Sequence, residues 1–152
     1  MKNVTLRAID ESNFIACFHL ELAPGQEEFV SHPIRSLAQA YVYRDQCQPF
    51  GVYDSEKLVG YVMVIYDYDE ACYNIWHLMI DKDHQGNGYG KAAMQRVLEY
   101  IRTKPFGPSD TVLITCNPEN IPAMRLYSSL GFRQTGRSDE DEVELGLTLT
   151  KA

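Results

Sequence analysis

The stretch Gln85-Gly86-Asn87-Gly88-Tyr89-Gly90-Lys91 decides the fold of this chain. Its three glycines separate an apolar, strand-like run at 75–80 from a helix-like run at 92–101. Because glycine lacks a Cβ, the backbone here can approach a ligand closely. Unpaired N–H groups at the start of a helix, together with the helix dipole, favour an anion such as phosphate. The stretch therefore predicts a phosphate-binding turn between a strand and a helix.

The composition indicates one globular domain covering residues 1–152, since 45% of the residues are hydrophobic and 23% are charged. The net charge of −7 argues against nucleic acid or an anionic membrane as the main partner and weakly favours a cationic substrate. Four scattered cysteines form no C-x-x-C pair or Cys/His cluster, so we expect no metal site. The chain opens on polar sequence and has no apolar run long enough to span a bilayer, so we expect a cytoplasmic protein.

Hydrophobic periodicity predicts an α+β domain. We expect a mixed, mostly antiparallel central sheet of six to seven strands, flanked by about four helices. Strands are expected at 5–9, 49–53, 58–66, 73–80, 112–116 and 143–149, with a further short strand near 133. Helices are expected after Asp10 to about Leu22, at 26–43 with an interruption near Pro33, at 92–101 and at 121–130.

Two familiar phosphate-binding loops do not fit the glycine stretch. A Walker A loop requires Ser or Thr after Gly-Lys, but Ala92 follows Gly90-Lys91, and position 85 is Gln rather than Gly. The dinucleotide fingerprint requires a third glycine where Lys91 stands, and it expects a parallel βαβ unit. A glycine-rich turn without a ligand remains the alternative.

Two segments resemble the signatures of the GNAT superfamily of acyl-CoA-dependent N-acyltransferases. Gln85-x-x-Gly88-x-Gly90 matches its Q/R-x-x-G-x-G/A loop. Asn120-x-x-Ala123-x-x-Leu126-Tyr127-x-x-x-Gly131-Phe132 resembles its second signature. The resemblance implies a GNAT fold that is splayed between the strands at 73–80 and 112–116. It also implies acetyl-CoA as the cofactor, with CoA as product.

Residues 29–30, 36–43 and 76–81 look like the Bacillus-type spermine/spermidine (diamine) acetyltransferases within that superfamily. This likeness implies a polyamine acceptor. Many superfamily members are dimers, so a homodimer is expected, and the last strand, if exposed, could join two subunits.

The superfamily resemblance also implies a set of cofactor-binding residues. Backbone amides of the loop would hold the pyrophosphate, and the strand before the loop would hold the pantetheine arm. For Lys91 a solvent-exposed position on the helix is an equal alternative to a phosphate contact, and for the strand residues ordinary core packing is compatible with binding. The expected set is Leu78, Met79, Ile80, Gln85, Gly86, Asn87, Gly88, Tyr89, Gly90, Lys91, Asn117, Asn120, Ala123 and Tyr127.

Tyr127 matches the superfamily's general acid, which protonates the departing thiolate. Considered on its helix alone, it could equally be a buried aromatic. The general base is less clear, because the strand at 73–80 has no carboxylate. His77 is the titratable group best placed on that strand, although it could be a half-buried structural histidine. Glu142, Glu144 or a chain of waters are alternatives.

Acidic and aromatic residues in the first helices and in the 67–70 loop suit a cationic amine through ion pairing and cation–π contact. The candidate substrate-binding residues are Glu27, Glu28, Tyr41, Asp69 and Glu70. We therefore expect an N-acetyltransferase that acts on a polyamine by direct attack in a ternary complex. A protein N-terminus, an amino acid or an aminoglycoside as acceptor, or an acyl-CoA sensor without turnover, remain alternatives.

Overall fold

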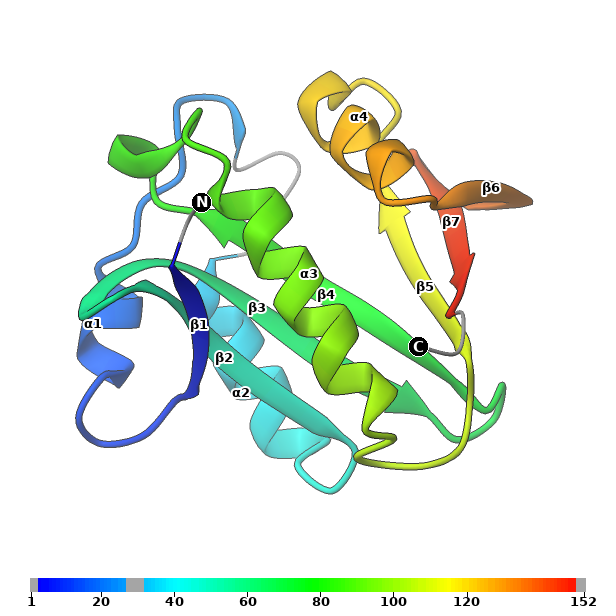
Figure 1. Cartoon of the computed structure of the whole chain (residues 1–152), viewed down its shortest axis with the longest axis horizontal. Coiled ribbons are helices and arrows are strands. Elements are labelled where there is room, and N and C mark those ends of the chain that lie inside the picture. Colours follow the sequence, from blue (N-terminus) through cyan, green and yellow to red (C-terminus); the bar gives the residue numbers. More distant parts are fainter. Residues whose placement is uncertain (1–2, 27–31, 150–152) are drawn as a thin grey trace.

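The computed structural model describes residues 3–26 and 32–149 and contains one seven-stranded sheet with helices on both faces (Figure 1). Its strands lie in the order β1-β2-β3-β4-β5-β7-β6. The strands are β1 (Val4–Ala8), β2 (Cys47–Asp54), β3 (Lys57–Asp67), β4 (Cys72–Ile80), β5 (Thr111–Cys116), β6 (Arg133–Asp139) and β7 (Glu142–Thr148). The helices are α1 (Phe14–Phe18), α2 (Pro33–Val42), α3 (Tyr89–Arg102) and α4 (Ile121–Ser129).

The sheet is mixed and mostly antiparallel, which confirms the predicted fold class. Strands β1 to β4 pair antiparallel in sequence order, β4 and β5 pair parallel, and β5-β7-β6 are again antiparallel. The extra strand expected near 133 is β6, which forms one edge of the sheet. The last strand is β7, and it lies between β5 and β6, so the expectation that it could be exposed and join two subunits was wrong.

Alternation along β3 builds a core on each face of the sheet. Val62, Val64 and Tyr66 belong to the core beneath α3. Tyr61 and Met63 point to the opposite face, toward α1 and α2. Five residues of α3 are buried against the sheet, namely Ala93, Met94, Val97, Leu98 and Ile101.

The sheet opens between β4 and β5. These strands pair in register only at Tyr73↔Val112 and Asn74↔Leu113, so they separate toward their carboxyl ends, as predicted for 73–80 and 112–116. In Figure 1, α4 and β5–β7 accordingly diverge from α3 and β4. An irregularity in the β3–β4 register coincides with this opening. Trp76 pairs with Met63 and Met79 with Tyr61, so β4 has one residue more than β3 between these pairs, which is a β-bulge.

The first helix is shorter than its sequence pattern predicts. α1 is a five-residue helix, and Phe14, Ile15 and Phe18 are each about half exposed, whereas Cys17 is its buried residue. Asp10 does not cap it: the Asp10 carboxylate accepts hydrogen bonds from Ser12 instead. An Asp side chain can accept hydrogen bonds from nearby residues in a turn as readily as from the N–H groups at the start of a helix, which explains why Asp10 does not cap α1.

The helix expected at 26–43 begins only at Pro33, whose fixed φ suits the first turn of a helix. Residues 27–31 lie outside the described part of the chain. Asn120 occupies the position before α4 as predicted, but its side chain makes no capping hydrogen bond. Gly131, with φ of 99°, follows the end of α4 as expected.

Candidate active site

The glycine loop adopts the backbone conformations that its sequence predicts. Gly86 and Gly88 have φ of 78° and 83°, in the left-handed region that residues with a Cβ disfavour. Gly88 is the N-cap of α3, and no atom lies within 4 Å of the position that a Cβ would take at either glycine. The loop therefore presents open backbone at the positive end of a 14-residue helix.

Side chains of the loop fasten it to its surroundings. Gln85 Nε2 donates to Ile80 O at 2.9 Å and to Gln26 Oε1 at 2.7 Å. Asn87 Nδ2 donates to His84 O at 3.0 Å, and the Tyr89 hydroxyl donates to the Asp54 carboxylate. These side-chain bonds stabilise the loop at the start of α3.

A cavity of about 540 Å³ opens over this loop, and we call it the loop cavity. It brings together most of the predicted cofactor residues: Leu78, Met79, Ile80, Gln85, Gly86, Gly88, Tyr89, Gly90, Lys91, Asn120, Ala123 and Tyr127. Asn87 is absent from its wall, because its side chain is turned back onto the loop. Sequence reasoning missed five lining residues: Leu22, Gln26, His84, Pro122 and Leu126. Leu126 stands within the second signature and could have been found, whereas Leu22 and Gln26 come from a segment with no such signal.

A second cavity, of about 400 Å³, opens at the splay between β4 and β5, and we call it the splay cavity. Its walls include Trp76 and His77 from β4, Thr115 from β5, Glu142 from β7 and Gln39 from α2. Asn117, predicted to contact the cofactor, lines this cavity and not the loop cavity. The two cavities share four residues, Leu78, Asn120, Ala123 and Tyr127. They therefore adjoin each other at Tyr127.

Tyr127 is only 7% exposed, and its ring packs edge-on against Phe132 with centroids 6.1 Å apart. Burial raises the pKa of the Tyr127 phenol above its ordinary value, and the neighbouring Cys116 and Glu142 add to this effect. The phenol is therefore protonated throughout the neutral range. A proton donor thus stands where the two cavities meet.

His77 is the extra residue of the β4 bulge, and its φ of 62° is unusual for a residue with a side chain. Its Nδ1 lies 2.7 Å from Ser36 Oγ on α2, and Ser36 Oγ lies 2.7 Å from the buried Tyr61 hydroxyl. Burial, with the Arg35 charge, lowers the pKa of His77 to about 4. His77 is therefore a neutral imidazole on the wall of the splay cavity.

Three of the predicted substrate-binding residues lie in the described part of the chain, and none of these three lines either cavity. Tyr41 is 72% exposed on α2, and neither Asp69 nor Glu70 lines the splay or the loop cavity. Glu27 and Glu28 lie outside the described residues.

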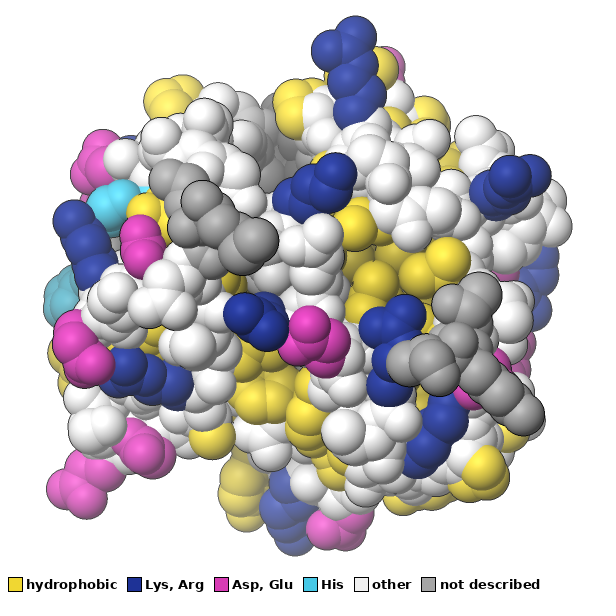
Figure 2. All heavy atoms as spheres, viewed as in Figure 1, with side chains coloured by type: hydrophobic (Ala, Val, Ile, Leu, Met, Phe, Trp, Pro, Cys, Tyr) yellow, Lys and Arg dark blue, Asp and Glu magenta, His cyan; other side chains and the backbone are white. Residues whose placement is uncertain are grey.

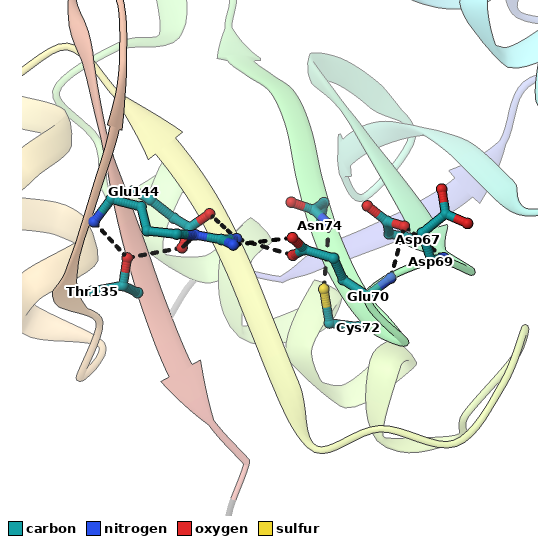
Figure 3. Close-up of polar contacts among 8 residues, drawn as sticks. Asp67, Asp69, Glu70, Cys72, Asn74, Thr135 and Glu144 are labelled. Atoms are coloured by element: carbon teal, nitrogen blue, oxygen red, sulfur yellow. Dashed lines mark hydrogen bonds and ion pairs between the residues drawn. The ribbon is translucent and has the colours of Figure 1, made fainter.

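Glu70 is instead part of an ion cluster with Arg137 and Glu144 (Figure 3). Arg137 Nη1 and Nη2 donate to the two Glu70 carboxylate oxygens at 3.0 and 2.9 Å, and Arg137 also donates to Glu144 at 2.8 Å. Sequence spacing could not reveal this cluster, because its members come from the β3–β4 loop, β6 and β7.

The face of the molecule that carries α3 has basic and acidic side chains scattered over it, without a continuous patch of one sign (Figure 2). Within residues 3–26 and 32–149, no group of three or more His, Cys, Asp or Glu side chains is placed to hold a metal ion. No helix in the same ranges is long and apolar enough to cross a membrane.

A sheet splayed at its centre, an open glycine loop at the start of α3 and a buried phenol between two cavities are the features expected of an acyltransferase that uses an acyl-CoA. Residues 14–132 match the Acetyltransferase (GNAT) family. The chain belongs to this family, and it is an acetyl-CoA-dependent N-acetyltransferase by class.

Individual relatives agree with this class. The chain is 39% identical over 102 residues to human N-acetyltransferase 8B, a match that covers 63% of this chain but only 44% of the human protein. It is 25% identical over 146 residues to a probable spermine N(1)-acetyltransferase of Bacillus subtilis subsp. natto, covering 90% of this chain and 92% of that protein. The crystal structure of a Vibrio cholerae spermidine N-acetyltransferase in complex with CoA and spermine has the same fold, with a TM-score of 0.73, 21% identity and 95% coverage of both chains.

Proposed function

We propose that this protein transfers the acetyl group of acetyl-CoA to a primary amine of a small cationic acceptor, a polyamine such as spermidine or spermine. One observation carries the proposal: the loop cavity and the splay cavity meet at Tyr127, so a cofactor in one and an amine in the other would have their reacting atoms beside a proton donor. The similarity to the Bacillus spermine acetyltransferase over nine-tenths of the chain supports the polyamine class.

The cofactor would occupy the loop cavity. Its pyrophosphate suits the open backbone of the loop that ends at Gly90 and the dipole of α3. Its pantetheine arm suits the edge of β4 beyond Asn74, where β4 has no register pair with β5, so the arm can bond to backbone at 78–80. The small side chain of Ala123, shared by both cavities, leaves room for the thioester.

The acceptor would enter the splay cavity, whose wall combines the Glu142 carboxylate with the Trp76 indole. A carboxylate and an aromatic face both attract an ammonium group. The net charge of −7 adds a general attraction for a polycation.

The chemistry follows from this placement as direct attack in a ternary complex. The neutral amine nitrogen attacks the thioester carbon, a C–N bond forms, and the C–S bond breaks as the tetrahedral intermediate collapses. Tyr127 donates its hydroxyl hydrogen to the departing sulfur, which would otherwise leave as a thiolate in a poorly solvated site. The imidazole of His77 lines the acceptor side and helps to shape it.

Thiol release from acetyl-CoA, measured with a panel of amines, tests the proposed function. Spermidine and spermine should have the highest kcat/KM, ahead of lysine, a peptide N-terminus and an aminoglycoside. A preference for a neutral amine or for a peptide would contradict the polyamine assignment. Binding of CoA without release of thiol for any amine would indicate an acyl-CoA sensor.

We infer that the protein acts in the cytoplasm as a homodimer. All four cysteines are buried free thiols, which suits a reducing compartment. Every residue of the edge strand β6 is exposed, and an unpaired strand edge is a ready surface for a second subunit. Sedimentation analysis at several concentrations tests the dimer.

A further inference from the structure

The splay cavity contains a carboxylate that no cation in the described chain neutralises. Glu142 is partly buried, and its one hydrogen bond is a long one, 3.5 Å from Thr115 Oγ1. It forms no ion pair within residues 3–26 and 32–149. A partly buried carboxylate without a cation is costly, so Glu142 favours a ligand that brings a positive charge and N–H donors.

Glu144, the other carboxylate on β7 that was considered as a base, already accepts hydrogen bonds from neighbouring side chains. Glu144 accepts hydrogen bonds from Arg137 at 2.8 and 3.0 Å and from Thr135 Oγ1 at 2.8 Å (Figure 3). These bonds lower the pKa of Glu144, Arg137 contributing most. Glu144 is therefore a poor proton acceptor, and it does not line the splay cavity.

The hydrogen bonds among His77, Ser36 and Tyr61 also argue against His77 as the general base. The buried Tyr61 hydroxyl finds an acceptor in Ser36 Oγ, which leaves the Ser36 hydroxyl hydrogen for His77 Nδ1. If His77 Nδ1 donated instead, the Ser36 hydrogen would go to the Tyr61 oxygen or to Met63 Sδ at 3.9 Å. A bond from Ser36 to the Tyr61 oxygen leaves the Tyr61 hydroxyl hydrogen without an acceptor. A bond from Ser36 to Met63 uses sulfur, which is a weak acceptor. The favoured tautomer thus carries its hydrogen on Nε2, so His77 can donate from that nitrogen but has no free lone pair.

We propose, resting on the proposed function, that Glu142 binds the acceptor's ammonium group in the splay cavity and is its general base. Glu142 lines the same cavity as Tyr127, so base and acid flank the place where the C–N bond forms. Trp76 adds an aromatic surface beside them.

The protons balance in this scheme. The ammonium nitrogen carries three hydrogens, of which one passes to Glu142 and frees the lone pair for attack. A second leaves the nitrogen after attack and replaces the hydrogen that Tyr127 gives to the sulfur. The third remains in the amide product, and Glu142 returns its proton to water.

Burial, a hydrogen bond and nearby charges together set the pKa of Glu142. Burial raises its pKa, with smaller contributions in the same direction from Asp139 and Glu140, while the Thr115 hydrogen bond opposes them. The other titratable groups that line its cavity are neutral His77, Cys116 and Tyr127. A carboxylate with a raised pKa is a better base at neutral pH than an ordinary one.

Glu142→Gln tests the assignment, with Glu144→Gln as the matched control on the same strand. At pH 7, Glu142→Gln should lower kcat/KM for spermidine by about 10²- to 10⁴-fold, the usual contribution of a general base. Its remaining activity should rise with pH up to about 10, where the free amine becomes abundant without a base. Glu144→Gln should keep the wild-type pH profile and lose less than about tenfold.

A further measurement separates a catalytic effect from a folding defect. In calorimetry, Glu142→Gln should bind CoA with the affinity of the wild type, because the substitution leaves the loop cavity unchanged.

If the wild type is active and Glu142→Gln stays within about threefold of it at pH 7, the role of Glu142 is refuted and the proposed function stands. If the wild type transfers acetyl to no amine, both are refuted.

Discussion

In the proposed mechanism, Tyr127 serves packing and chemistry together. Its ring packs against Phe132, and the residue lines both cavities. Burial raises the pKa of the phenol, so the hydrogen needed at the leaving sulfur is always present. Packing thus orients the donor, and desolvation keeps it protonated.

Replacing Tyr127 with Phe should keep the ring packing and remove the donor. We expect kcat to fall by about 10- to 10⁴-fold, with KM for acetyl-CoA nearly unchanged. Tyr100→Phe is the control, since Tyr100 is a partly buried phenol on α3 that lines neither cavity. Equal rates for wild type and Tyr127→Phe in stopped-flow thiol assays would rule out the acid role.

His77 should make the protein sensitive to acid. Burial lowers the pKa of His77 to about 4, whereas in the unfolded chain it is about 6.5. As the pH falls from about 6.5 to about 4, the unfolded chain binds a proton that the folded chain does not, so stability falls in that window. Urea unfolding of His77→Asn should show a flatter pH dependence, since Asn tolerates the left-handed backbone and does not titrate. The same replacement at exposed His19 is the matched control.

At the scale of elements, the conformation of the loop before α3 depends both on its own glycines and on hydrogen bonds to distant parts of the chain. Gly86 and Gly88 allow the left-handed turns, and the helix behind them supplies the dipole. The bonds from Gln85 to the end of β4 and to Gln26 then hold the turn at the mouth of the loop cavity.

Gly88→Ala should separate the structural cost of this turn from its role in binding. Left-handed backbone disfavours alanine, so the free energy of unfolding should fall by about 1–2 kcal/mol. The Kd for CoA in calorimetry should rise about tenfold or more, equivalent to about 1.4 kcal/mol or more. Gly136→Ala on β6 is matched in backbone, with φ of 93° and open space around it, and should be destabilised without any change in Kd. Similar CoA affinities in the two variants would contradict anion binding at this loop.

At the scale of the molecule, the two halves of the splayed sheet share few strand contacts, and a cluster on its surface adds a connection. β4 and β5 pair at only two positions in register. Arg137 on β6 reaches Glu70 in the β3–β4 loop as well as Glu144 on β7 (Figure 3). The cluster therefore links the strands on either side of the opening.

Arg137→Gln should lower the Tm, because it leaves Glu70 and Glu144 without their shared cation. The difference from wild type should shrink as NaCl approaches 1 M, since salt screens exposed charges. Arg133→Gln is the control, because Arg133 is exposed on the same strand and forms no ion pair in the described part of the chain. Equal melting temperatures for the two variants at low salt would show that the cluster contributes nothing.

The expectation for Tyr127 came from the resemblance of its segment to a family signature. Local patterns in the sequence were enough to predict the glycine turn, the helix that follows it and the α+β class. Each of these features depends on short-range spacing. A helix repeats every 3.6 residues and a strand every two, so side chains at these spacings lie on the same face and are buried or exposed together. The same reasoning failed for α1, where an apolar stripe lies half exposed on a helix too short to be directed by its periodicity alone.

The tertiary structure alone decided which residues line the splay cavity, the proposed acceptor site. Gln39, His77, Thr115 and Glu142 come from four different elements and meet only because the sheet opens between β4 and β5. No periodicity within one element encodes such a meeting, because the order of strands in the sheet is set by long-range pairing. For the same reason Glu70, an acceptor candidate on charge alone, is bound by Arg137, while Glu142 forms no ion pair in the described part of the chain and lines the same cavity as the phenol.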